Sequence, residues 1–247
     1  MTKLTEFSEF IWTAYHPLRL AGMEMGARST IIRLPSERLV IVSPVPFDDD
    51  TATAIDELGE VDTIIAPNLM HYQYFNDACR RWPTARALVP PGLEDKVDVV
   101  DRAVAMGHRG SIEDALYWRA LDGMPRIGEH AFIEPRNGVL ILTDVAFHYR
   151  DHPQWWLRLV MRINGTYNRF GPSRLLRAFA IDDKDALGRS LEALLDFDWD
   201  TIVVSHGEPI DNGARRRFLH AFGDYLPERR EITDSTDSAD SAPERVR

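Results

Sequence analysis

Val139-Leu-Ile-Leu-Thr-Asp-Val-Ala-Phe147 is the stretch of sequence around which the rest of the chain can be arranged. Its first four residues are apolar and follow Asn137-Gly138, a pair typical of a tight turn, so residues 139–142 are predicted to form a short buried strand. Asp144 then lies just beyond the carboxyl end of that strand. A buried carboxylate is unfavourable unless it is paired, hydrogen-bonded or bound to a metal, and Asp144 therefore requires a partner.

Two further strand ends offer a partner for that carboxylate. The mostly apolar residues 61–66 precede Asn68 and His71, and the β-branched residues 201–204 precede His206. A glycine follows His206 and can adopt backbone angles that other residues avoid. Taken singly, an aspartate after a strand is often a turn former, and a lone histidine often packs or caps. The repetition at three strand ends favours one shared polar site at the edge of a sheet.

Length and composition are those of a single α/β domain, which we place over residues 1–227 of the 247. The net charge of −10 argues against general nucleic-acid binding, which depends on clustered positive charge. Cys79 is the only cysteine, which excludes an intramolecular disulfide and a thiolate-rich metal site. A metal in this chain must therefore use histidine, carboxylate or water. From Pro227 the sequence is almost entirely polar or charged, so residues 228–247 are expected to be a disordered tail.

The first residues of the chain carry acids where a signal peptide needs an uninterrupted apolar run. No apolar run approaches the length of a membrane span. These two observations favour the cytoplasm as the location of the protein.

The first half of the sequence alternates predicted strands and helices, which favours an α/β sandwich. Residues 1–20 are interpreted as a segment that docks across the body, and residues 93–128 receive no assignment. Asn68–Tyr74 is predicted to open a second helix that ends near Trp82-Pro83. The other predicted elements are strands 29–34, 38–42, 61–66, 85–89, 130–134, 139–142 and 201–204, and helices 49–58, 183–197 and 212–222.

An insertion at about residues 146–180 has a different character, because aromatic and aliphatic residues alternate with arginines. Arg158 and Arg162 lie one helical turn apart and predict an amphipathic helix with an arginine stripe. We favour a solvated arginine face with Trp155 and Trp156 in the core or in a dimer contact. A lid that supplies cations to an anionic substrate is the second interpretation. A helix lying on a membrane is the third, and the overall acidity disfavours it.

Three motifs, in this order along the chain, resemble an uncharacterised branch of the metallo-β-lactamase-like hydrolase fold. They are Ala66-Pro-Asn-Leu-Met-His71, Leu140-Ile-Leu-Thr-Asp144 and Val203-Val-Ser-His-Gly207, and the early hairpin Ser29–Pro46 is similar to that branch as well. The resemblance covers roughly residues 20–225. It implies a four-layer αββα sandwich with a site at one edge of two facing β-sheets.

The resemblance also implies a metal site, which departs from the usual pattern of the superfamily. Asp144 matches the metal-bridging aspartate and His206 the last histidine ligand. When the first-loop signature His-x-His-x-Asp-His is aligned with residues 68–73, His71 falls at a position that carries no ligand in the signature. No clear counterpart exists for the intermediate histidine, although two histidines lie in the interval. The positions of the missing ligands are occupied by Asn68, Met70, Tyr72 and Gln73, and the two histidines in the interval are His108 and His130.

Our first functional hypothesis is a hydrolase of a small ester, amide or lactone. One zinc, iron or manganese ion would be held by His71, Asp144 and His206, with an open position for water. Asp144 and His148 are the candidate catalytic residues, His148 as acid/base or fourth ligand. Alternatively, His148 and His152 are both surface residues of the insertion. Substrate would be bound by Asn68, Arg158 and Arg162. A mononuclear iron redox enzyme would use the same three ligands.

The second hypothesis is a metal-free binding or scaffold protein in which the three polar residues hydrogen-bond to one another and the insertion is an interaction surface. Ser-His-Asp chemistry through Ser43 or Ser205 is weakly supported, because neither serine lies in a Gly-x-Ser-x-Gly turn. Cys79 is interpreted as a buried apolar side chain rather than a nucleophile. The expected partners are a small-molecule substrate and a second copy in a homodimer, with neither nucleic acid nor a membrane.

Overall fold

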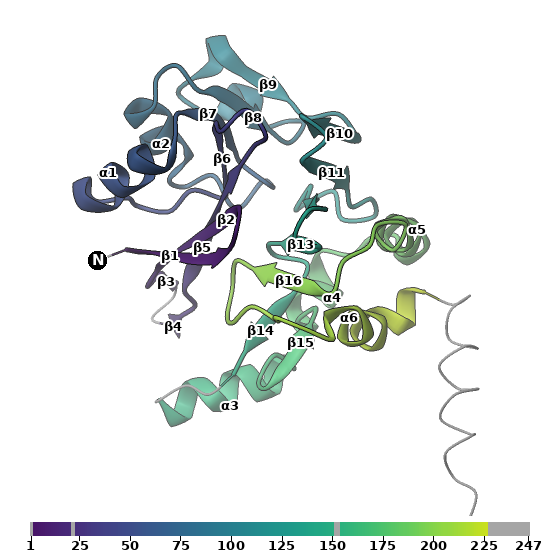
Figure 1. Ribbon diagram of the computed structural model, residues 1–247. Helices are drawn as coiled ribbons and strands as arrows, with labels where there is room; N and C mark the ends of the chain where they lie inside the picture. The colour runs from purple at the N-terminus through teal and green to yellow at the C-terminus, as the bar shows by residue number, and fades with distance from the viewer. Residues whose placement is uncertain (1, 21–22, 151–153, 227–247) are drawn as a thin grey trace, which may run out of the picture.

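Two β-sheets face each other in the computed structural model, which describes residues 2–20, 23–150 and 154–226. Helices cover the outer face of each sheet, so the chain forms four layers in the order α, β, β, α (Figure 1). This arrangement confirms the predicted αββα sandwich. Within the described residues no helix is long and apolar enough to cross a membrane. Residues 228–247, where we expect a tail, lie outside the described part.

The first sheet uses only the N-terminal half of the chain and has seven strands in the order β1-β2-β5-β6-β7-β8-β9. The strands from β1 to β6 are antiparallel neighbours, whereas β6, β7, β8 and β9 run parallel to one another. Helices α1 (Asp49–Leu58) and α2 (Phe75–Arg81) lie on its outer face. The strands are β1 (Lys3–Ser8), β2 (Ile11–His16), β5 (Ala27–Arg33), β6 (Leu39–Val42), β7 (Val61–Ile65), β8 (Arg86–Val89) and β9 (Ala103–Ala105).

The second sheet has five strands in the order β10-β11-β12-β13-β16. Its last pair, β13 and β16, is parallel, with Leu142 opposite Val204, so the carboxyl ends of both strands meet at one edge. Helices α5 (Lys184–Leu194) and α6 (Ala214–Phe222) cover its outer face. The strands are β10 (Arg109–Ile112), β11 (Leu116–Ala120), β12 (His130–Glu134), β13 (Val139–Leu142) and β16 (Thr201–Val204).

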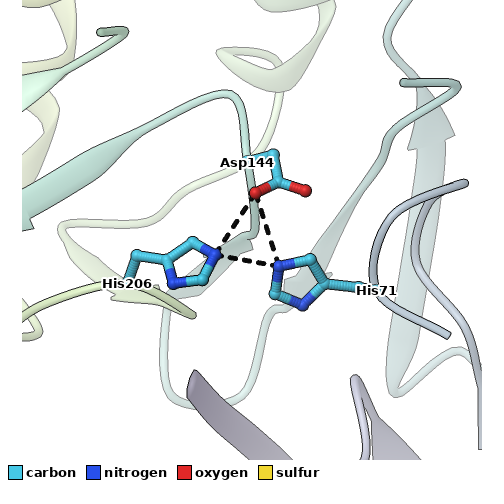
Figure 2. A group of neighbouring side chains, drawn as sticks. All are labelled: His71, Asp144 and His206. Atoms are coloured by element: carbon cyan, nitrogen blue, oxygen red, sulfur yellow. Dashed lines mark hydrogen bonds and ion pairs between the residues drawn. The ribbon is translucent and has the colours of Figure 1, made fainter. Parts of the chain in front are cut away.

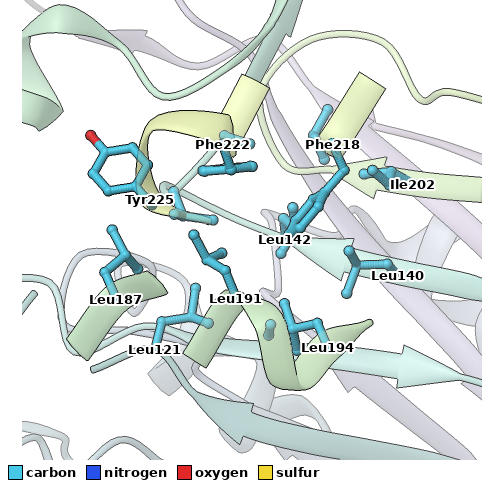
Figure 3. Packing of buried hydrophobic residues seen from close by; sticks show 14 of the residues in the cluster. Leu121, Leu140, Leu142, Leu187, Leu191, Leu194, Ile202, Phe218, Phe222 and Tyr225 are labelled. Atoms are coloured by element: carbon cyan, nitrogen blue, oxygen red, sulfur yellow. The ribbon is translucent and has the colours of Figure 1, made fainter. Parts of the chain in front are cut away.

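Alternation along the buried strands divides the apolar residues between layers, since successive side chains of a strand point to opposite faces. In β13, Val139 and Ile141 point into the core between the sheets, whereas Leu140 and Leu142 point to the outer helices. Figure 3 shows the outer core of the second sheet, where side chains of β13 and β16 meet those of α5 and α6. Its labelled members are Leu121, Leu140, Leu142, Leu187, Leu191, Leu194, Ile202, Phe218, Phe222 and Tyr225.

The insertion after Asp144 contains two further helices and a small two-stranded sheet. Strand β14 (Phe147–Tyr149) pairs antiparallel with β15 (Arg169–Gly171), and helix α3 (Trp155–Asn164) lies between them in sequence. Helix α4 (Arg174–Phe179) follows β15 and packs through Leu176 on the outer core of the second sheet. The remaining elements are the hairpin β3 (Arg19–Leu20) and β4 (Met23–Glu24), and the short helices η1 (Glu94–Lys96), η2 (Val100–Arg102) and η3 (Gly223–Tyr225).

Most predicted strands and helices are present, with three differences. The segment expected to dock across the body instead forms the β1–β2 hairpin of the first sheet. Its inner strand is buried over residues 11–14, so it lacks the alternation by which a half-exposed strand is recognised. Helix α2 begins at Phe75 rather than within 68–74, because Asn68 Oδ1 accepts the backbone N–H groups of Met70 and His71 and holds this segment in turns. The unassigned residues 93–128 contain β9, β10 and β11.

Candidate metal centre

His71, Asp144 and His206 converge at the shared edge of the two sheets (Figure 2). His71 Nε2 lies 3.0 Å from His206 Nε2 and 3.4 Å from Asp144 Oδ1. His206 Nε2 lies 3.3 Å from the same carboxylate oxygen. Within residues 2–20, 23–150 and 154–226 this is the one group of three or more acidic, histidine or cysteine side chains with metal-ligand spacing. The sequence prediction that these three residues share a site agrees with this geometry.

Strand ends position the three side chains. Asp144 and His206 each stand two residues beyond the parallel pair β13 and β16, and so leave the same edge of the second sheet. His71 comes from the first sheet, six residues after β7 ends at Ile65. The three side chains are largely but not fully buried, with exposed fractions of 11% for His71, 14% for Asp144 and 6% for His206. The centre is therefore only slightly exposed to solvent.

Asn68 fixes two of the three ligands through a single amide. Its Nδ2 donates to Asp144 Oδ2 at 2.8 Å and to the hydroxyl of Thr143 at 2.9 Å. Its Oδ1 accepts the backbone N–H groups of Met70 and His71 at 2.8 and 2.7 Å. Asn68 is fully buried, and both ends of its amide are engaged within the protein. The structure therefore places Asn68, predicted to bind substrate, behind the ligands as a positioning residue.

Glu129 holds the backbone of the Asp144 loop. Its carboxylate accepts the N–H groups of Thr143, Asp144 and Val145 at 2.8 to 2.9 Å, and the side chain is fully buried. Burial, together with the negative charge of Asp144, raises the pKa of Glu129 to about 7. Sequence reasoning missed this residue, because an acid that binds mainly backbone N–H groups far along the chain has no recognisable motif. Its position directly before the fully buried strand β12 was the one available signal.

The outer nitrogens of both imidazoles are fixed by residues that flank strands of the first sheet. His206 Nδ1 donates to the carbonyl oxygen of Gly26 at 2.7 Å, and the ring stacks on Phe147 with the centroids 5.4 Å apart. His71 Nδ1 lies 2.8 Å from the hydroxyl of Ser43, a residue with a positive φ of 56° at the end of β6. Histidines that bind metals use this arrangement, in which the second ring nitrogen is held by a carbonyl or another polar group. Both Nε2 atoms thus point inward.

The charges of the centre are coupled. Burial alone would raise the pKa of Asp144, but the neighbouring His71 and His206 hold it well below its usual range. Burial alone would lower the pKa of His206, yet the hydrogen bond and negative charge of Asp144 raise it above its usual value. Without another cation, a proton shared among the three groups therefore stabilises the cluster. A metal ion would compete with that proton for the same lone pairs.

The residues present fit a single metal ion. Ligand atoms bound at about 2.0–2.2 Å lie roughly 3.3–3.6 Å apart around a tetrahedral ion and roughly 2.8–3.1 Å apart around an octahedral one. The separation of 3.0 Å matches the octahedral range, and those of 3.3 and 3.4 Å match the tetrahedral range. Two imidazole nitrogens and one carboxylate oxygen are also donors that zinc, iron and manganese accept.

Other predicted site residues lie outside this cluster. The ring of His148 is buried and its Nδ1 donates to the carbonyl oxygen of Glu208 at 2.6 Å, while burial lowers its pKa. Arg158 and Arg162 lie on helix α3 of the insertion, where the Arg162 guanidinium stacks over Tyr167. Neither candidate for the intermediate histidine is in the cluster: His108 pairs with Asp122 at the surface, and His130 is buried within β12. His152 falls outside the described residues.

The candidate nucleophiles are buried. Ser43 contacts His71, which could suggest serine chemistry, but its side chain is buried next to the end of β6. Ser205 is buried as well and donates to the carbonyl oxygen of Arg28. Cys79 is fully buried in α2, and burial raises the pKa of its thiol to about 11. None of the three is placed to attack a ligand at the centre.

No protein-family model matches the sequence, and no curated protein matches it. Several solved structures match the fold over most of the chain. The metallo-β-lactamase from Pontibacter korlensis is 13% identical with a TM-score of 0.61, and the match covers 91% of this chain and 100% of that one. The FIM-1 metallo-β-lactamase from Pseudomonas aeruginosa, in its mono-zinc form, is 11% identical with a TM-score of 0.60 over 92% and 97% of the two chains.

A flavodiiron core, Flv1 from Synechocystis, is 14% identical with a TM-score of 0.63, and the match covers 93% of this chain and 62% of that one. These identities establish similarity of fold rather than of activity. They agree with the two facing sheets and outer helices described above. The chain therefore has the metallo-β-lactamase fold.

Proposed function

We propose that the protein is a metal-dependent hydrolase that binds one divalent ion through His71, Asp144 and His206 and acts on a small ester, amide or lactone. The observation that carries this proposal is the spacing of the three inward-facing ligand atoms at 3.0 to 3.4 Å. Their outer atoms are held by Ser43, Asn68 and the carbonyl oxygen of Gly26. Such pre-orientation is what a metal site requires and what a set of ordinary buried polar residues does not.

A bound ion would act as a Lewis acid and would generate a nucleophile from water near neutral pH. The protein residues supply the positioning. Asn68 prevents rotation of the Asp144 carboxylate and leaves Oδ1 as its inward oxygen. Asp144 and the two neutral imidazoles together carry one negative charge. A divalent ion held by them would keep a net positive charge, which would polarise the carbonyl group of a substrate.

A centre with a single ion is favoured over one with two. The side chain of Met70 is 63% exposed, and thioether sulfur is a soft ligand poorly suited to a hydrolytic ion. The amide of Asn68 is fully engaged within the protein. The described chain therefore offers no second set of ligands beside the first.

A mononuclear iron redox enzyme is the second candidate. Two histidines and one carboxylate on one side of an ion also describe non-haem iron sites that keep open positions. The similarity of fold to a flavodiiron core supports this candidate. The identity of the ion bound by the purified protein separates the two candidates.

The test is metal content by elemental mass spectrometry on untagged protein, with Asp144→Ala and His206→Ala variants. Asp122→Asn is the matched control, because Asp122 also pairs with a histidine but lies at the surface. About one ion per chain in the wild type and control, lost in both site variants, is expected. Hydrolysis of an ester and lactone panel should disappear in the same variants. Wild-type protein that takes up no ion, even after incubation with zinc, iron or manganese, would refute the proposal in favour of a metal-free scaffold.

A further inference from the structure

Helices α3 and α4 present a largely exposed apolar surface. Helix α3 buries only two of its apolar side chains, Leu157 and Met161. The others are between 37% and 69% exposed, although a surface helix ordinarily turns such residues toward the core. We define the α3–α4 surface as Trp155, Trp156, Leu159, Val160 and Ile163 of α3 with Leu175 and Phe179 of α4.

The helical repeat makes these residues contiguous on α3. At about 100° per residue, Trp155, Leu159 and Ile163 form one stripe, and Trp156 and Val160 form the next. Together with the buried face they make an apolar arc of about 240°, more than twice the width a surface helix needs. Arg158 and Arg162 occupy the remaining arc and border the exposed stripes. Only a small part of this arc is used for packing within the described chain.

The surface continues onto α4. The Arg174 guanidinium donates to the carbonyl oxygen of Ile163 at 3.1 Å, and the Leu175 N–H donates to Asn164 Oδ1 at 3.0 Å. The start of α4 is thus attached to the end of α3. Phe179 lies one turn beyond Leu175 on the same face of α4. Figure 1 shows α3 at the periphery of the molecule, beyond the β14–β15 pair and away from the two large sheets.

The charge of this region is opposite to that of the whole chain. Residues 154–181 contain five arginines and neither aspartate nor glutamate, within a chain of net charge −10. Arg177 lies 3.5 Å from Asp224 of η3. In the part of the chain that the structure describes, no carboxylate pairs with Arg162, Arg169 or Arg174. The region therefore carries a local positive charge next to its exposed apolar side chains.

We propose that the α3–α4 surface docks on an anionic lipid surface. Tryptophan and aliphatic side chains would enter the headgroup layer, and the bordering arginines would contact lipid phosphates and carboxylates. This inference is independent of the metal centre and of the proposed hydrolase. It departs from our expectation of no membrane partner, which rested on net charge. Electrostatic attraction at a surface acts over about one Debye length, roughly 10 Å, so the local charge decides it.

A second copy of the chain is the alternative occupant. If this surface packed on the same surface of a second copy, the arginines of the two copies would come together. Residues 154–181 contain no carboxylate that could neutralise them in either copy. An anionic membrane, in contrast, complements both the apolar side chains and the arginines. Charge complementarity therefore favours lipid over self-association.

The experiment is co-sedimentation of the full chain with vesicles of phosphatidylcholine alone or mixed with phosphatidylserine. The wild type is expected to sediment with the mixed vesicles, less at high salt, and with a blue shift of tryptophan emission. Leu159→Ser with Ile163→Ser should weaken binding more than about tenfold, and Arg162→Ala about fivefold. Val104→Ser and Arg109→Ala are the matched controls, because both side chains are exposed on the first and second sheets, outside the insertion.

Binding lost in the α3 variants and retained in the controls supports the proposal, provided that all variants share the wild-type thermal transition. No sedimentation with the mixed vesicles overturns it, and so does equal binding by the α3 variants. Light scattering provides a further decisive outcome. If the wild type is a dimer that does not bind vesicles, and the Leu159 and Ile163 substitutions dissociate it, the surface is assigned to a second copy instead.

Discussion

His71 Nε2 and His206 Nε2 face each other at 3.0 Å, although the two residues are 135 positions apart and come from different sheets. Because His206 Nδ1 donates to the carbonyl oxygen of Gly26, Nε2 of neutral His206 carries no hydrogen. Its lone pair points at the His71 nitrogen and at Asp144 Oδ1. The three atoms require either a hydrogen or a metal ion among them, and neutral His71 supplies the hydrogen from Nε2 when Ser43 donates to its Nδ1.

Replacing Asn68 should weaken metal binding without removing a ligand. Asn68→Ala frees Asp144 Oδ2 and the turn that carries His71, so we expect a loss of about 10–100-fold in metal affinity. Asn76→Ala is the control, since Asn76 lies in α2 and its Oδ1 accepts the backbone N–H of Asp98, away from the centre. Chelator competition measures both. Equal affinities in the two variants would show that Asn68 does not position the ligands.

The protonation of His206 in metal-free protein should depend on Asp144. Asp144 raises the pKa of His206 above 6.5, whereas burial alone would lower it, so Asp144→Asn should move the pKa below that value. NMR titration of the imidazole protons after chelator treatment measures the change. The pKa of His130, which burial lowers, provides the internal control and should not move. A His206 pKa that is unchanged by Asp144→Asn would contradict the coupling.

The same pair predicts how the stability of metal-free protein varies with pH. The raised pKa of His206 stabilises the fold below pH 6.5, and this contribution disappears as the pH rises through the folded-state value. The lowered pKa of Asp144 stabilises the fold above pH 3.8 and is lost on acidification. The contribution of the pair is therefore greatest between these limits. Thermal denaturation of the wild type and Asp144→Asn should differ most in this range, and the difference should shrink as the pH rises through the folded-state pKa of His206.

A methyl group at Gly207 should destabilise both the fold and the centre. Gly207 has a φ of +100°, and an added Cβ would lie 2.1 Å from the carbonyl oxygen of His148. We expect Gly207→Ala to lower the free energy of unfolding by about 2–4 kcal/mol and to weaken metal binding through the adjacent His206. Gly92→Ala is the control, because Gly92 also has a positive φ, of 87°, but open space around it. Chemical denaturation should show a much smaller loss in the control, about 1 kcal/mol.

Cys79 should be unreactive in the native protein. With its pKa raised to about 11, only about one thousandth of the thiol is ionised at pH 8, and the side chain is buried. A chromogenic disulfide reagent should therefore label Cys79 only after denaturant is added. Rapid stoichiometric labelling without denaturant would show that the core around α2 opens readily.

Strand ends were predictable from the sequence because burial and polarity change there within a few residues. Apolar runs followed by Asp144 and His206 indicated strands that end at a shared sheet edge, and parallel pairing of the two strands brings both residues to that edge. His71 was found by the same reasoning although the first-loop signature is absent. The predicted roles of the remaining site residues, including His148, stay predictions.

Contacts that depend on distant backbone groups were not predictable. Glu129 binds three N–H groups of the Asp144 loop, and Gly26 offers only a carbonyl oxygen to His206. Neither contact needs a particular residue type on the backbone side, so the sequence contains no matching pattern. Helix α3 illustrates a related limit. Periodicity predicted the helix and its arginine stripe, but periodicity cannot tell which part of a wide apolar arc the rest of the chain will cover.

The division of the metal centre between the sheets bears on when the centre can form. The first sheet ends at Ala105 and supplies His71, whereas the second begins at Arg109 and supplies Asp144 and His206. A growing chain therefore cannot complete the centre until residue 206 has been made and the two sheets have docked. An ion bound there would link the two sheets and so the two halves of the chain. Uptake of the ion would therefore report that folding is complete, and its release would report that the two halves have begun to separate.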